Sequence, residues 1–202
     1  MSLTAEPTPV ARESRPSVMT VPLQTWHAFR SGDETVVARC TGPTLDVGCG
    51  PGRMAHALAT AGVPALGIDI SKEAVAQARA RGAAALRRDV FGHVPAAGRW
   101  HHVLLLDGNV GIGGDPRRVL TRCRASLRGT GTIVTEAEPA GRPTERTWLQ
   151  LVINGRRTDP LPWARVSVDT VGFLATSMGL EVAARWVSGG RHFLELRRRE
   201  AG

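Results

Sequence analysis

The chain has 202 residues, of which 42% are hydrophobic and 22% charged, a composition typical of a soluble globular protein with one full hydrophobic core. Its formal net charge of +8 comes almost entirely from arginine, and we interpret it mainly as scattered, solvated surface charge. An anionic partner or a nucleic acid is the alternative that this charge leaves open.

The cysteines and the N-terminus indicate the compartment. The three cysteines form no C-x-x-C pair, so the sequence signals neither a metal site nor a disulfide framework. Prolines 7, 9 and 16 stand where a signal peptide would need an apolar core, and no apolar run approaches the roughly 18 residues of a membrane span. We therefore expect a cytoplasmic protein that neither binds a metal nor enters a membrane.

The first segments of the chain are weakly patterned. Residues 1–22 are rich in Pro, Ser, Thr and Glu without periodicity, which predicts a flexible tail. Residues 23–40 carry spaced apolar side chains, including Trp26, and predict a helical segment. Residues 23–202 contain no repeat and no insertion large enough for a second domain, so we expect one domain.

A glycine-rich stretch follows the first predicted strand. Residues 44–47 are a short apolar run, and Gly48, Gly50 and Gly52 come at alternate positions before an Ala/Leu-rich segment at 54–61. This pattern predicts a buried strand, a tight turn and the start of a helix. The glycines allow positive φ and leave room for a ligand, to which the helix N-terminus offers free N–H groups.

Spacing separates the protein classes that build such a turn. A phosphate-binding P-loop ends in Gly-Lys-Ser/Thr, but the chain's only lysine is Lys72. The dinucleotide fingerprint G-x-G-x-x-G requires glycine where this chain has Arg53. The pattern that remains is Asp-x-Gly-x-Gly-x-Gly, beginning at Asp46.

This pattern resembles motif I of the class I S-adenosylmethionine-dependent methyltransferases, and the chain is also similar to small stand-alone bacterial members of that family. The resemblance covers about residues 43–136. It implies an α/β fold with a Rossmann-like, doubly wound, seven-stranded and mostly parallel sheet that ends in an antiparallel hairpin. It also implies S-adenosyl-L-methionine as cofactor, with the glycines beside its amino-acid part.

The next strand ends in an acid. Residues 64–70 predict a buried strand, and Asp69 at its carboxyl end is suited to accept hydrogen bonds from both hydroxyls of a ribose. Ser71 is the expected N-cap of a helix that stops at Gly82. A third strand is expected at 83–86.

The resemblance implies roles for the residues that follow. Asp89 is expected to bind the adenine amine and the backbone of Val90 a ring nitrogen. A fourth strand at 100–106 ends in Asp107, and we expect Asp107 and Asn109 to lie near the methyl group as the candidate catalytic residues. The alternative, that Asp107 is a structural cap on a glycine-rich loop, stays open. Altogether the resemblance implies cofactor contacts at Asp46, Gly48, Cys49, Gly50, Gly52, Asp69, Ile70, Asp89, Val90 and Asp107.

The last third of the chain closes the predicted sheet. Asp115 and Pro116 predict the start of a helix that reaches residue 127, and a fifth strand is expected at 132–136. Further elements are an edge strand at 148–153, a helix at 166–178, and a hairpin at 180–186 and 192–196. Residues 1–40 and 137–165 are left to cover the acceptor.

Two missing motifs bear on the acceptor. The chain lacks the Asn/Asp-Pro-Pro-aromatic motif of enzymes that methylate base amines, and it has no loop cysteine suited to pyrimidine-carbon methylation. Nucleic acid is therefore an unlikely acceptor. We expect in-line O- or N-methylation of a small molecule; a non-catalytic cofactor-binding module and a macromolecular acceptor are the alternatives. The sequence predicts neither the acceptor's identity nor the oligomeric state.

Overall fold

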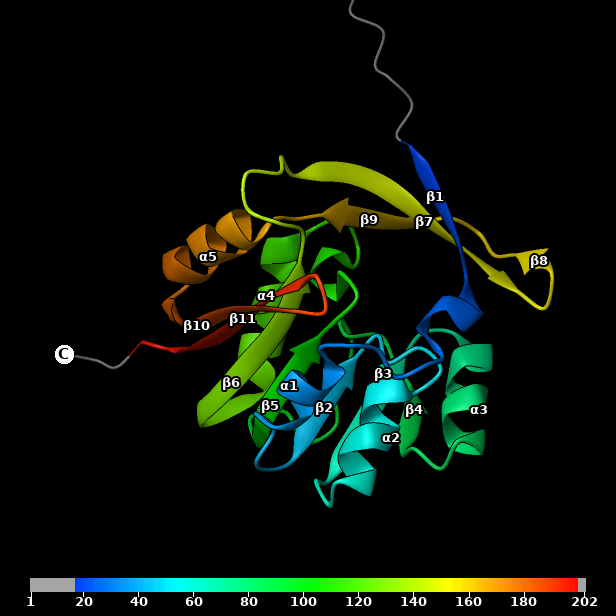
Figure 1. Cartoon of the computed structure of the whole chain (residues 1–202), viewed down its shortest axis with the longest axis horizontal. Coiled ribbons are helices and arrows are strands. Elements are labelled where there is room, and N and C mark those ends of the chain that lie inside the picture. The colour runs from blue at the N-terminus through cyan, green and yellow to red at the C-terminus, as the bar shows by residue number, and fades with distance from the viewer. Residues whose placement is uncertain (1–16, 200–202) are drawn as a thin grey trace, which may run out of the picture.

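The computed structural model describes residues 17–199, which form a main sheet, a smaller covering sheet and flanking helices (Figure 1). The main sheet has seven strands in the order β10-β11-β6-β5-β2-β3-β4. These strands are β2 (Thr44–Val47), β3 (Ala65–Asp69), β4 (Ala85–Arg87), β5 (Trp100–Leu105), β6 (Leu127–Ala137), β10 (Leu180–Ser188) and β11 (Arg191–Arg198).

The five strands from β2 to β6 run parallel, and β11 lies antiparallel between β6 and β10. This is the predicted seven-stranded sheet with its closing hairpin, so the expected fold class is confirmed.

Helices cover both faces of the main sheet because its central strands are apolar on both sides. They are α1 (Asp33–Val37), α2 (Arg53–Thr60), α3 (Lys72–Ala80), α4 (Pro116–Ser126) and α5 (Val168–Ser177). On β5, Leu104 packs in one cluster with α1 and α2, and the neighbouring Val103 and Leu105 pack in another with α4 and α5. Successive side chains of a strand point to opposite faces, which explains this alternation.

The predicted caps hold the helices that follow the strands. The side chain of Ser71 accepts a hydrogen bond from the backbone N–H of Ala74 at the start of α3. Asp115 accepts one from the N–H of Arg118 at the start of α4, with Pro116 as the first helical residue. Each cap satisfies a backbone donor that the helix leaves free. Both predicted N-caps are confirmed.

The covering sheet lies across the carboxyl ends of the main strands (Figure 1). It contains β1 (Val18–Pro22), β7 (Glu145–Ile153), β8 (Arg156–Arg157) and β9 (Leu161–Arg165). β7 pairs with β1 in parallel and with β8 and β9 antiparallel. The segment 137–165, in which the sequence indicates one edge strand, thus holds three strands.

The first described residues differ from the prediction. Residues 1–16 of the predicted tail lie outside the described residues, but Val18–Pro22 form β1, so the tail prediction is wrong for these five. Their partner β7 is too distant in sequence for a local pattern to reveal it. The helix predicted at 23–40 is also wrong in part, because the segment forms the 3-10 turn η1 (Leu23–Trp26) and the short helix α1.

Gly32 separates η1 from α1. Its φ is +98°, and a Cβ at this residue would lie 2.8 Å from the carbonyl oxygen of Ser188. Only glycine fits both constraints easily, so the chain turns here instead of continuing one helix. None of the helices between residues 17 and 199 has the length and hydropathy of a membrane-spanning segment.

The covering sheet docks on the main sheet through Gly111, in the 3-10 turn η2 (Asn109–Gly111) after β5. A Cβ at Gly111 would lie 1.8 Å from the carbonyl oxygen of Ala164 in β9, a clash with backbone that cannot rotate away. We expect Gly111→Ala to lower the free energy of unfolding by about 1–3 kcal/mol, measured by urea denaturation. Gly129→Ala is the control, because its Cβ meets open space; equal stability of both variants would contradict this docking contact.

Candidate functional site

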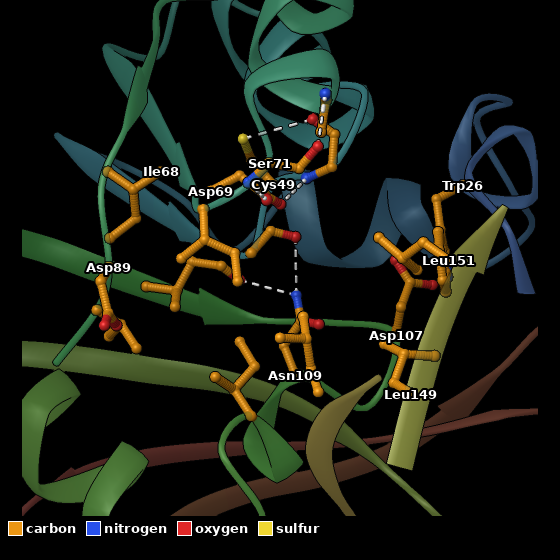
Figure 2. Close-up of a pocket in the computed structure, with 18 of the residues that line it drawn as sticks. Trp26, Cys49, Ile68, Asp69, Ser71, Asp89, Asp107, Asn109, Leu149 and Leu151 are labelled. Atoms are coloured by element: carbon orange, nitrogen blue, oxygen red, sulfur yellow. Dashed lines mark hydrogen bonds between the residues drawn. The ribbon is translucent and has the colours of Figure 1, made fainter. Parts of the chain in front are cut away.

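A cleft of about 590 Å³ opens between the carboxyl ends of the main strands and the covering sheet. The glycine loop after β2, the ends of β3 to β5 and side chains of β7 and β9 form its walls. Figure 2 shows Asp89 and Asp107 toward opposite sides of this cleft, with Leu149 and Leu151 of the covering sheet on the side of Asp107. In open α/β sheets, ligands bind at this edge.

The three glycines of the loop serve different purposes. All have positive φ, +69° at Gly48, +52° at Gly50 and +78° at Gly52. A Cβ on Gly52 would lie 2.6 Å from Cβ of Ala78, so glycine there lets α3 approach the loop. A Cβ on Gly50 would meet nothing within 4 Å, which leaves the backbone open to the cleft. The loop is therefore closely packed on the protein side and accessible on the other.

Asp69 ties this loop to the end of β3. Its Oδ2 accepts a hydrogen bond from the N–H of Gly50 at 3.0 Å, and its Oδ1 accepts one from the N–H of Ser71 at 2.8 Å. Burial raises the pKa of Asp69, and these backbone donors oppose that shift. The carboxylate is thus fixed in orientation in the cleft wall, with lone pairs left for a ligand's hydroxyls.

Asp46 lies beneath the loop and is 3% exposed. Burial raises its pKa to about 7, while the charge of Arg53 opposes the shift and the charge of Asp107 adds to it. A carboxyl group whose pKa is raised this far by burial is characteristic of functional sites. Asp46 also lines the cleft, so a bound cation would favour its charged form.

Asn109 holds the glycine loop from the other side. Its Nδ2 donates to the carbonyl oxygens of Val47 at 2.8 Å and of Gly48 at 3.0 Å, as the dashed lines in Figure 2 show. Asn109 is 8% exposed, and a Cβ on Gly48 would lie 2.7 Å from its Nδ2. The amide therefore requires glycine at Gly48 and fixes the direction of the Gly48 carbonyl.

Asp107 is surrounded by arginines. It lies two residues beyond the end of β5 and has a φ of +54°. Its Oδ1 accepts from Nη1 of Arg30 at 2.7 Å and its Oδ2 from Nη2 of Arg53 at 2.9 Å. Burial raises the pKa of Asp107, and the arginine charges oppose that shift. Each oxygen of Asp107 is therefore held in orientation by a guanidinium group.

The ion pairs continue behind Asp107. Asp33 is fully buried and contacts Nε of Arg53 at 3.0 Å and Nη1 of Arg191 at 2.7 Å. Nη2 of Arg191 in turn contacts Oε2 of Glu136 at 2.7 Å. Burial alone would raise the pKa of Glu136, but its hydrogen bond to Arg191 and that charge lower it. We call these six residues the ion network: Arg30, Asp33, Arg53, Asp107, Glu136 and Arg191.

The remaining predicted cofactor residues line the cleft as well. Asp89 is exposed, and its Oδ1 accepts from the N–H of Phe91 at 2.8 Å. Val90 is buried, whereas the Ile70 side chain is 46% exposed. Cys49 packs against Gly67, where a Cβ would lie 2.6 Å from its Sγ, and burial raises the pKa of its thiol. That thiol is a packing group in this loop.

His27 and His192 lie apart from the cleft wall. His27 contacts Arg81 through its backbone carbonyl at 2.6 Å and through Nδ1. His192 lines a neighbouring cavity instead. Within residues 17–199, no group of three or more His, Cys, Asp or Glu side chains is arranged to hold a metal ion. Trp26, by contrast, lines the cleft.

Sequence reasoning missed most of the ion network. Arg30, Asp33 and Arg191 carry no motif and come together only through the fold, from segments that precede β2 and follow β10. Arg53 was visible only as the residue that breaks a dinucleotide fingerprint. The glycine at Gly32 and the acid after it are the one local signal of a specific turn there.

Comparison with known proteins agrees with this geometry. Residues 44–131 match the family model described as a methyltransferase domain. No curated protein sequence matches the chain.

Solved structures match across most of the chain. One is a SAM-dependent methyltransferase from Bacteroides fragilis in complex with S-adenosyl-L-homocysteine, at 22% identity and a TM-score of 0.68, covering 83% of this chain and 77% of that one. Another is the CcbJ methyltransferase from Streptomyces caelestis, at 15% identity and a TM-score of 0.64, covering 89% and 91%. A third is the glycopeptide N-methyltransferase MtfA, at 15% identity and a TM-score of 0.62, covering 94% and 100%.

The domain match and the shared fold support a class I S-adenosylmethionine-dependent methyltransferase. The resemblance seen in the glycine motif is thereby confirmed.

Replacing Asp46 by asparagine tests the burial of its carboxyl. A carboxyl with a pKa of about 7 in the folded protein and about 4 in the unfolded chain holds its proton more tightly when folded. Its contribution to stability therefore falls as the pH rises from about 4 to about 7. We expect the stability of Asp46→Asn relative to wild type to grow by about 1–3 kcal/mol between pH 5 and pH 8, measured by urea unfolding. A difference independent of pH would contradict the raised pKa.

Proposed function

We propose that the cleft binds S-adenosyl-L-methionine and that the protein methylates a small-molecule acceptor on oxygen or nitrogen. The observation that carries this proposal is the cleft wall itself. An open glycine loop and an oriented acid, Asp69, meet there at the ends of adjacent parallel strands.

The nucleoside half of the cofactor fits the end of the cleft at β3 and β4. Asp69 is the acid suited to the ribose hydroxyls, since one carboxylate accepts two hydrogen bonds from a diol. Asp89 and Val90 lie beyond it in the cleft wall and are suited to the adenine edge. Ile70, half-exposed in the same wall, offers an apolar contact to the ring.

The amino-acid half fits the glycine loop. Nη1 of Arg53 is buried and has no hydrogen-bond partner among residues 17–199, although Arg53 lines the cleft. A buried, unpaired guanidinium nitrogen is costly, and a ligand carboxylate would satisfy it. Asp46 and the fixed carbonyl of Gly48 offer negative charge to an ammonium group nearby. The residues present therefore fit both charges of an amino acid.

When bound, the cofactor supplies a methyl group on a positively charged sulfur. The chain's own task is to hold the acceptor in line with that methyl group and to keep water out. We propose that Asp107 and Asn109 serve this task by position: Asp107 anchors Arg30 and Arg53, and Asn109 fixes the glycine loop. No step in this scheme requires either side chain to take a proton.

The size of the cleft favours a small acceptor. Its volume of about 590 Å³ lies within the range of small-molecule sites. The covering sheet closes the cleft with apolar side chains, among them Leu149, Leu151 and Trp163. A non-catalytic binding module and a macromolecular acceptor are the alternatives, which methyl-transfer assays with labelled cofactor separate from the proposal.

Calorimetric titration with S-adenosylhomocysteine tests the cofactor. We expect micromolar binding by the wild type and a loss of tenfold or more in Asp69→Ala, because two charge-assisted hydrogen bonds are removed. Glu181→Gln is the control, since it alters an exposed ion pair with Arg197 far from the cleft. If the folded wild type does not bind S-adenosylhomocysteine, the cofactor assignment is wrong.

A truncated ligand tests the role of Asn109. We expect Asn109→Ala to bind S-adenosylhomocysteine about tenfold more weakly, because the Gly48 carbonyl loses its fixed direction. Its affinity for 5′-methylthioadenosine, which lacks the amino-acid part, should stay within about twofold of wild type. Calorimetry measures both ligands. Equal losses for the two ligands would mean that the substitution disturbs the whole cleft.

A further inference from the structure

A second cavity of about 320 Å³ adjoins the cleft. It lies at the carboxyl ends of β5 and β6 and the start of β11, with side chains of β1 and β9 on its other walls. Trp26, Asp107 and Trp163 line both spaces, so the two meet at these residues. Of the cofactor contacts that the resemblance implies, only Asp107 also lines this second cavity. Its volume is at the lower end of the range for small-molecule sites.

Every carboxylate in the wall of the second cavity is paired with an arginine. Asp107 is held by Arg30 and Arg53, both oxygens of Glu136 accept from Arg191, and Glu138 pairs with Arg165 at 3.0 Å. These acids are therefore poor partners for a cationic acceptor.

Arg30 differs from the other arginines of this wall. Its Nη1 contacts Asp107 at 2.7 Å, but among residues 17–199 its remaining guanidinium nitrogens have no protein partner. Its side chain is 36% exposed. Arg165, by comparison, directs Nε and Nη2 to Glu138 and Nη1 to Glu145. Arg30 thus offers unused donors in the wall of the second cavity, next to Asp107.

The balance of charges favours an anion where the cleft and the second cavity meet. The ion network contains three arginines and three acids, so its formal charges cancel. A positively charged sulfur bound in the cleft would add a positive charge beside this balanced network. In a partly buried site this attracts a negatively charged acceptor and repels a positively charged one.

Resting on the function proposed above, we propose that the second cavity binds a small carboxylic acid as its carboxylate, that Arg30 receives this carboxylate, and that one of its oxygens is methylated. The acceptor oxygen forms the new bond to the methyl carbon while the carbon–sulfur bond breaks and its electron pair goes to sulfur. The products are a methyl ester and a neutral thioether. No proton moves in this step, because the acceptor is already a carboxylate.

Benzoate and its uncharged analogue benzamide are the probes. With protein saturated with S-adenosylhomocysteine, ligand-observed NMR titration should show benzoate binding about tenfold or more tightly than benzamide, because only the anion gains a charge-assisted bond to Arg30. Sinefungin, which carries a positive amine in place of the sulfonium, should strengthen benzoate binding relative to S-adenosylhomocysteine.

Variants at Arg30 test the residue. Arg30→Met should abolish the preference for benzoate, and Arg30→Lys should restore part of it, because a lysine keeps the charge without the planar fork. Arg185→Met is the matched control: it also breaks an arginine–aspartate pair, with Asp169, but on the exposed surface. Thermal unfolding of each variant verifies folding. Equal binding of the two probes, or an unchanged preference in folded Arg30→Met, would overturn the proposal.

A separate measurement identifies the methylated atom. With methyl-labelled cofactor and benzoate, we expect labelled product that alkali converts to methanol, as an ester requires. Counts no higher than in a blank without protein, or a product stable to alkali, would overturn the assignment of the oxygen. Calorimetry with S-adenosylhomocysteine separates the two proposals. If the wild type does not bind this ligand, the cofactor assignment is wrong. If it binds the ligand but shows no preference for benzoate over benzamide, only this inference is wrong.

Discussion

The buried guanidinium of Arg53 is the constraint on which the site depends. It is 4% exposed and sits between two carboxylates, Asp33 of the N-terminal segment and Asp107 at the end of β5. A buried charge without such partners would cost several kcal/mol, so the three elements that supply these groups must come together for any of them to be stable. Arg53 itself begins α2, directly after the glycine loop.

The position of this ion network links the cofactor cleft to the second cavity. Arg53 lines the first space, Arg30 and Arg191 line the second, and Asp107 lines both. Any displacement of one partner leaves another unpaired in a poorly solvated place. The geometry of the two spaces is therefore set by one network of charges and not by two independent sets of contacts.

Local signals in the sequence were sufficient for the parallel core of the main sheet. The apolar strands, the glycine turn and the caps at Ser71 and Asp115 each depend on residues within a few positions of one another, and these predictions hold in the structure. The covering sheet is different, since β1 is half-exposed and acquires its partner only from β7. Likewise, nothing near Asp33 or Arg191 indicates that they will meet, because their contact depends on the completed sheet.

The parallel pairing of β1 with β7 also has a consequence for how the chain folds. Ser17 and Thr147 are 130 residues apart, and their side chains hydrogen-bond at 3.0 Å where the two strands begin. During synthesis, β2 to β5 emerge and can form their parallel core well before β7 exists. β1 cannot pair until β7 has been synthesised. Closing so long a loop also carries an entropic cost, which only the contacts with β7 can offset. The covering sheet thus forms late, from residues 18–22 and 145–165, upon parallel strands that are already in place.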